Sequence, residues 1–120
     1  MEEKHCKSCG RRFAWRRKWA ANWESVSYCS TACRKRRVNR LDKALEAAIL
    51  TRLRAVNAGA SICPSEVAQA ECGDSWRSEM ETVRRAARRL ANAGAIVITQ
   101  KGKIVDPSDV RGPIRIRLVS

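Results

Sequence analysis

The chain has 120 residues, 44% of them hydrophobic, which is enough for one ordinary domain or two small ones. Its 25 Lys and Arg against 12 Asp and Glu give a net charge of +13, a field that attracts nucleic acid first and anionic membrane second, or that merely keeps the protein soluble. Lys, Arg or Glu interrupts each apolar stretch well short of the about 20 residues of a membrane span, so we exclude a membrane-spanning class and expect a cytoplasmic protein.

Four cysteines near the N-terminus have the spacing of a structural zinc site. Two residues separate Cys6 from Cys9, three separate Cys29 from Cys33, and 19 lie between the pairs. Such pairs supply the four thiolates of a tetrahedral zinc ion, and four thiolates leave no open position for chemistry. In a reducing compartment, metal binding explains the cysteines better than disulfides do. We therefore predict one structural Zn²⁺ held by Cys6, Cys9, Cys29 and Cys33.

The residues around these cysteines predict a zinc knuckle followed by a helix, which resembles a small treble clef. Gly10 follows Cys9 and supplies the positive φ that lets amide groups face the sulfurs. Ser30 or Thr31 can cap a helix whose first turn carries Cys33. His5 adjoins Cys6, but beside a complete set of four cysteines we interpret it as an exposed bystander.

Three tryptophans between the cysteine pairs allow two interpretations. Trp15, Trp19 and Trp23 are four residues apart, so on a helix they would share one face while the intervening cations Arg16, Arg17 and Lys18 point elsewhere. They could stack on bases beside phosphate contacts. A module this small also needs its large aromatics as a core around the metal, and this second interpretation is favoured, with at least one tryptophan half exposed.

The remaining residues predict three helices and a hairpin. Apolar residues recur at helical spacing from Asn39 to Val56 and predict a first helix. Pro64 begins a short second helix that ends at Cys72, and a third helix spans Trp76–Asn92 before Gly94. Strands around 95–99 and 103–105 flank a turn with glycine at its tip, and Ile114, Ile116 and Leu118 mark a last strand. The run Arg34–Arg37 predicts a basic helical connector that joins the two parts rigidly.

Three helices followed by a basic hairpin is the order of a winged helix, in which the third helix enters the major groove and the wing meets phosphates. The predicted nucleic-acid contacts are then Arg77, Arg84, Arg85 and Arg88 of the third helix and Lys101 and Lys103 of the wing, with Arg16, Arg17 and Lys18 in the zinc module. The competing interpretation is a solvated face, because Glu81 can pair with Arg77, Arg84 or Arg85 at helical spacing.

Two resemblances accompany these patterns. Cys6, Cys9-Gly10-Arg11, Phe13, Trp15-Arg16, Lys18-Trp19, Tyr28-Cys29-Ser30 and Cys33-Arg34 make residues 4–37 similar to the bacterial domain of unknown function 2256, a zinc-ribbon-like module that usually has proline where this chain has Arg12. Cys63-Pro64-Ser65-Glu66, Trp76-Arg77, Thr99-Gln100-Lys101-Gly102 and Gly112-Pro113-Ile114-Arg115 make residues 42–118 resemble the domain of unknown function 3253. That resemblance implies a winged-helix-like fold and no established activity.

We therefore expect an α+β protein with a treble-clef-like zinc module at residues 1–38 and a winged helix at 39–120. The predicted function is non-catalytic binding of nucleic acid, DNA ahead of RNA, with no membrane or small-molecule partner. An enzyme is disfavoured because the one histidine adjoins the zinc cysteines, and no paired carboxylates, phosphate loop or Ser-His-Asp set is apparent. The alternative is an interaction adaptor that docks a protein partner through the tryptophan loop and the hairpin edge.

Overall fold

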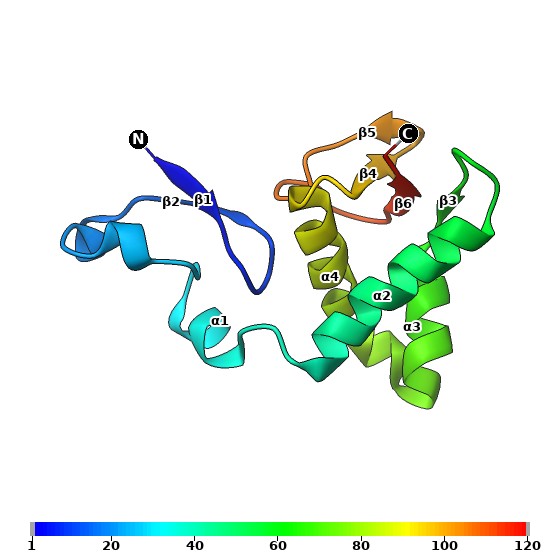
Figure 1. Cartoon of the computed structure of the whole chain (residues 1–120), viewed down its shortest axis with the longest axis horizontal. Helices are drawn as coiled ribbons and strands as arrows, with labels where there is room; N and C mark the ends of the chain where they lie inside the picture. Colours follow the sequence, from blue (N-terminus) through cyan, green and yellow to red (C-terminus); the bar gives the residue numbers. More distant parts are fainter. Residues whose placement is uncertain (1, 120) are drawn as a thin grey trace.

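The N-terminal part of the structure is a small β-hairpin followed by short helices (Figure 1). The computed structural model describes residues 2–119. Strands β1 (Glu3–His5) and β2 (Arg12–Ala14) pair antiparallel, and residues 6–11 between them carry the first cysteine pair. Two 3-10 helices follow, η1 (Arg17–Trp19) and η2 (Trp23–Ser25), and then α1 (Thr31–Arg36). Ser30 caps α1 by accepting a hydrogen bond from the N–H of Cys33, as predicted.

Three longer helices come next: α2 (Arg40–Ala55), α3 (Pro64–Cys72) and α4 (Met80–Asn92). Asn39 and Asp42 form a capping box that starts α2, because each side chain accepts a hydrogen bond from the other residue's N–H. These helices agree with the sequence prediction except at the start of the third. The turn around Trp76 is the 3-10 helix η3 (Gly73–Glu79), so the α-helix begins only at Met80.

A four-stranded antiparallel sheet completes the structure, in the order β3-β6-β4-β5. Its strands are β3 (Ser61–Ile62), β4 (Ile96–Gln100), β5 (Lys103–Ile104) and β6 (Arg115–Leu118). Lys101 and Gly102 have φ of 51° and 81° and form the two-residue turn between β4 and β5, so the predicted hairpin is present. Strand β3 has no counterpart in the sequence prediction, because two residues are too few to show an alternating pattern.

The main core lies between the helices and the sheet. Leu45 and Ile49 of α2, Val83 of α4, and Ile98 and Ile116 of the sheet are all 0–1% exposed. A second, smaller cluster consists of Cys6, Cys9 and Cys33 with Phe13 and Tyr28 packed against them. The expected α+β class with a cysteine cluster at the N-terminus is thus present, and no helix within residues 2–119 has the length and apolarity to cross a membrane.

The connector between α1 and α2 is a turn, and the prediction of a continuous basic helix over Arg34–Arg37 is wrong at its end. Helix α1 stops at Arg36, and Arg37 has a positive φ of 56°, which breaks the helical path. Asn39 then caps a new helix. The rigid junction between the two parts therefore has to come from contacts across the molecule.

Candidate metal centre and basic surfaces

The four predicted ligands converge on one point. The Sγ atoms of Cys6, Cys9, Cys29 and Cys33 all lie within 4.8 Å of one another. Cys29 Sγ is 3.7 Å from Cys9 Sγ and 3.7 Å from Cys33 Sγ. A tetrahedral zinc ion with Zn–S bonds of about 2.3 Å would hold its sulfurs about 3.8 Å apart. The cluster could therefore hold a metal ion, and its size and thiol donors fit zinc.

The first cysteine pair lies on a tight turn that faces its amides toward sulfur. The N–H of Cys9 lies 3.5 Å from Cys6 Sγ, and Gly10, with φ of 80°, closes the turn by donating its N–H to the Cys6 carbonyl. The hydrogen bond from the Cys9 thiol lowers the pKa of Cys6 to about 4, whereas burial raises the pKa of Cys29. A metal ion bound here would stabilise all four cysteines as thiolates.

Helix α4 packs one face against this turn, which we call the knuckle (residues 6–10). Arg88 donates from Nε to the Cys9 carbonyl at 2.6 Å, Arg89 donates to the Ser8 carbonyl at 2.6 Å, and Asn92 donates to the Gly10 carbonyl at 2.9 Å. Three successive carbonyls of the cysteine turn thus accept hydrogen bonds from one helix face. Arg85 donates to the Ser8 hydroxyl and lies 3.8 Å from Cys33 Sγ.

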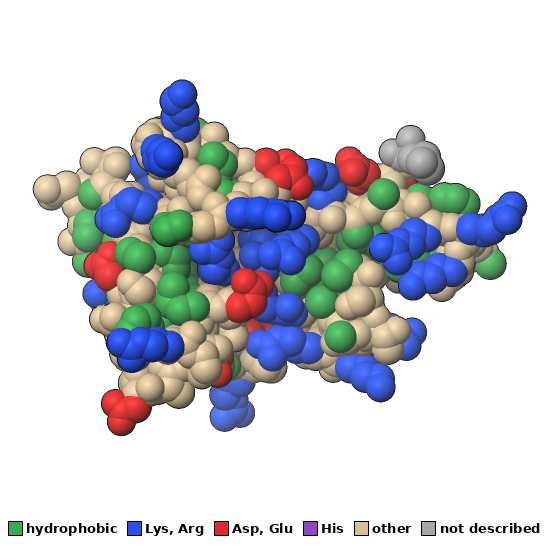
Figure 2. Space-filling view, turned by 180° about the vertical axis from the view of Figure 1, so that it is seen from behind, with side chains coloured by type: hydrophobic (Ala, Val, Ile, Leu, Met, Phe, Trp, Pro, Cys, Tyr) green, Lys and Arg blue, Asp and Glu red, His purple; other side chains and the backbone are tan. Residues whose placement is uncertain are grey.

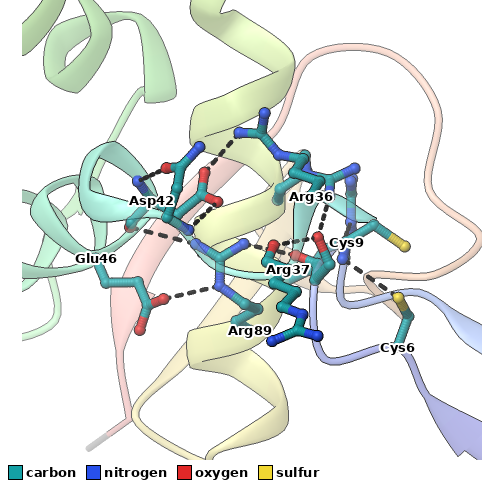
Figure 3. A network of polar contacts seen from close by, with 11 residues as sticks. Cys6, Cys9, Arg36, Arg37, Asp42, Glu46 and Arg89 are labelled. Carbon is teal, nitrogen blue, oxygen red and sulfur yellow. Dashed lines mark hydrogen bonds and ion pairs between the residues drawn. The ribbon is translucent and has the colours of Figure 1, made fainter. Parts of the chain in front are cut away.

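The junction is reinforced by a polar network around two fully buried residues, Ser8 and Asp42 (Figure 3). The Ser8 hydroxyl donates to the Arg37 carbonyl at 2.6 Å, which ties the cysteine turn to the α1–α2 connector. Asp42 pairs with Arg36 at 2.7 Å. Arg89 pairs with Glu46 of α2 at 2.7 Å, so helices α2 and α4 and the knuckle share one network.

Arg12 forms a separate bridge between the two parts. Its guanidinium lies 2.6 Å from Asp106 and 2.8 Å from Asp109, and its backbone N–H donates to the Ser108 hydroxyl at 2.9 Å. The backbone N–H of Ser108, and next the Arg12 guanidinium, lower the pKa of Asp106. A proline at this position, as in the similar domain, would lack both the charge and the N–H.

The three tryptophans do not share one helical face, because the segment forms two separate 3-10 turns. Trp23 is buried, and Phe13 packs edge-on against both Trp19 and Trp23 at centroid distances of 5.6 and 5.7 Å. Trp19 and Trp15 are half-buried. The core interpretation therefore holds for Trp23, and the expected half-exposed tryptophan is present.

The predicted nucleic-acid residues divide into buried and exposed groups. Arg88 is 3% exposed and also pairs with Glu81 at 2.5 Å, so the prediction that it faces nucleic acid is wrong. Arg85 is committed to the knuckle, and Arg84 is half-buried and donates to the Gly112 carbonyl at 3.1 Å. In α4 only Glu81 and Asn92 are exposed. The six remaining predicted contacts are exposed: Arg16, Arg17, Lys18, Arg77, Lys101 and Lys103.

The exposed cations are spread over both parts of the molecule. Figure 2 shows Lys and Arg side chains gathered along the middle of one face, with acidic side chains among them, and a further group at the N-terminal end. Arg16 and Lys18 lie 5.7 and 4.9 Å from the centroid of the Trp19 ring, and Arg77 lies 4.5 Å from that of Trp76. Helical periodicity carries no signal that the polar face of α4 packs against the knuckle.

Comparison with known families follows the same division of the chain. Residues 42–119 match the family described as "Protein of unknown function (DUF3253)", and residues 1–36 match the family described as "Uncharacterized protein conserved in bacteria (DUF2256)". The first match covers more than half of the chain, which therefore belongs to that family, and the expected joining of the two families in one chain is confirmed. No curated protein matches the chain.

Proposed function

We propose that this member of the family of unknown function 3253 is a non-catalytic protein that holds one structural Zn²⁺ and binds nucleic acid, DNA ahead of RNA. Four thiolates would fill a tetrahedral site and leave no position for a substrate. The zinc would hold the hairpin of β1 and β2 against α1 and so shape the turn that docks on α4.

The nucleic-acid proposal rests on the large number of Lys and Arg side chains that have no carboxylate partner. Within residues 2–119, only four of the 25 Lys and Arg residues form ion pairs with carboxylates: Arg12, Arg36, Arg88 and Arg89. A face made of mutually compensating ion pairs would need many more of them. The uncompensated cations therefore favour a polyanionic partner over a merely solvated surface.

The cations proposed to contact nucleic acid lie outside α4, because the polar face of α4 packs against the cysteine turn. Lys101 and Lys103 sit on the β4–β5 hairpin, where a winged helix would carry its wing, and Arg77 precedes α4. The order of three helices and a hairpin supports a winged-helix fold. Burial of Arg88 argues against insertion of α4 into a groove, so we assign binding to the hairpin and to the cations of the zinc module.

The test compares binding to duplex DNA, single-stranded DNA and RNA over a range of salt concentrations. Affinity should fall steeply with salt, and replacing Lys101 and Lys103 by Gln should lower the slope of log K against log salt by about one unit per lost phosphate contact. Arg40→Gln with Arg54→Gln on α2 is the charge-matched control and should leave the slope nearly unchanged. If no salt-dependent binding exists, the adaptor alternative replaces this proposal, and the 63% exposed Ile104 becomes its first candidate contact.

A further inference from the structure

A hollow of about 300 Å³ lies in the N-terminal part, between the 3-10 helices and α1 (light blue and cyan in Figure 1). Its volume is at the lower end of the range of about 300–1,000 Å³ that small-molecule pockets occupy. The side chains that define its chemistry are Lys18, Trp19, Asn22, Tyr28, Thr31 and Arg34.

Two half-buried aromatic rings border this hollow. Trp19 packs on Phe13 and, at a tilt of 32° and 5.7 Å, on Trp23, and these two residues already supply the aromatic core of the N-terminal part. Tyr28 packs against the cysteine cluster. The accessible parts of the Trp19 and Tyr28 rings therefore face a space that the core does not need, and planar rings of this kind are where unpaired bases stack.

Most of the polar side chains around the rings have no hydrogen-bond or ion-pair partner within residues 2–119, whereas those of Ser25 and Ser30 are bonded to backbone groups. Among residues 2–119, the side chains of Lys18, Asn22, Tyr28, Thr31 and Arg34 form no hydrogen bond or ion pair with another protein group. The Lys18 ammonium instead lies over the Trp19 ring. An amide and two hydroxyls suit the edge of a base, and two cations suit a phosphate.

Two of the other hollows each lack one half of this combination. A larger one, of about 790 Å³, contains Trp15 and Trp23, but its charged lining is Glu2 and Glu24, which would repel a phosphate. Another hollow, of about 570 Å³ and lined by residues of β4 and of the loop before β6, contains cations such as Arg111 but no aromatic ring.

We infer that this hollow binds one unpaired nucleotide, with the base against Trp19 and Tyr28 and the phosphate near Lys18 and Arg34. The inference deepens the proposed function and rests on it, since it names single-stranded nucleic acid as the ligand of the zinc module. A neighbouring hollow is also lined by Tyr28 and contains Lys7 and Arg37. Its cations could contact the next phosphate of a bound strand. This arrangement favours a single strand over a free nucleotide as the ligand.

The experiment compares two charge-matched double variants in the full chain. Lys18→Gln with Arg34→Gln removes the two cations of the hollow, and Arg40→Gln with Arg54→Gln removes two exposed cations of α2 that do not line it. The probe is an oligothymidylate of about 10 nucleotides, within the usual site sizes of single-strand binders. We expect the first variant to lose about tenfold or more in affinity and the control about threefold or less. Equal zinc content in all variants serves as the check on folding.

A second readout tests stacking. Single strands should quench tryptophan fluorescence, and Trp19→Phe, which keeps an aromatic ring for the core, should remove most of the quenching. Equal losses in the two double variants, or quenching unchanged in Trp19→Phe, would overturn the inference while leaving nucleic-acid binding itself intact. If thymidine 5′-monophosphate binds in the hollow and the oligonucleotide does not, the site stands as a nucleotide site and the proposed function fails. Absence of binding by both probes rejects the inference.

Discussion

At the scale of single residues, the turn after the first cysteine pair is built for close approach. Gly10 has φ of 80°, and a Cβ placed on it would lie 2.4 Å from Cβ of Arg88. The neighbouring Ser8 is fully buried and bonded through both its hydroxyl and its carbonyl. Gly10 and Ser8 therefore both shape the cysteine turn and contact α4. A substitution at either residue should disturb the turn and the contact together.

Replacing Gly10 by Ala should destabilise the protein for two reasons. The left-handed conformation costs a non-glycine residue about 1–2 kcal/mol, and the new methyl group would clash with Arg88 and its backbone. Gly59→Ala is the matched control, because Gly59 has φ of 84° but nothing within 4 Å of an added Cβ. Urea unfolding should show a clearly larger loss for Gly10→Ala. Equal losses would mean that the close approach of turn and helix does not exist in solution.

At the scale of helices and strands, local patterns predicted most of the fold and missed how the parts meet. Helix α3 has its predicted ends, because Pro64 and the following glycine turn mark both of them. Val83, Ala87 and Leu90 recur at helical spacing within the predicted third helix, and all three are buried. The convergence of the four cysteines was predictable from their spacing alone. The opposite face of α4 was misread, because a charged stripe looks the same whether it meets solvent, phosphate or backbone carbonyls.

Arg88 distinguishes the structural role of this helix face from a binding role. Replacing it by Met keeps helix propensity and volume nearly constant but leaves the buried Cys9 carbonyl without its charged donor. Losses of this kind cost about 1.5–3 kcal/mol. Thermal unfolding should therefore show a clearly lower Tm for Arg88→Met, whereas Arg54→Met at an exposed position of α2 should change stability by less than about 0.5 kcal/mol. Unchanged stability in Arg88→Met would return this residue to the candidate binding surface.

At the scale of the whole molecule, contacts at several places hold the cysteine cluster against the C-terminal part of the chain. Three carbonyls of the knuckle accept hydrogen bonds from α4, Arg12 contacts the loop before β6, and Ser8 contacts the α1–α2 connector. The molecule is elongated, 47 Å by 30 Å by 22 Å, and these contacts cross its middle. A change at the cysteines is therefore expected to affect α4 as well as the N-terminal residues that a bound metal would organise directly.

Chelation provides the test of this coupling. Structural zinc contributes about 10–16 kcal/mol in small modules, so its removal should unfold residues 4–37. The carbonyl acceptors of Arg88, Arg89 and Asn92 would then be lost. Amide hydrogen exchange should accelerate in the second half of α4. It should remain unchanged in α3, which forms no hydrogen bond with the knuckle within residues 2–119.

Hydrogen exchange of α4, together with the zinc content of a cysteine variant, distinguishes a lack of coupling from a wrong ligand assignment. If α4 keeps its full protection after chelation, the two parts are independent and the docking contacts contribute little in solution. A Cys29→Ser, Cys33→Ser variant that still held one zinc tightly would instead contradict the ligand set itself. If the variant loses its zinc and α4 is deprotected to the same extent as in the chelated wild type, then the metal acts on the C-terminal helices through the cysteine turn. Arg85, Arg88 and Arg89 would become accessible only in that metal-free state, because the turn is what covers them.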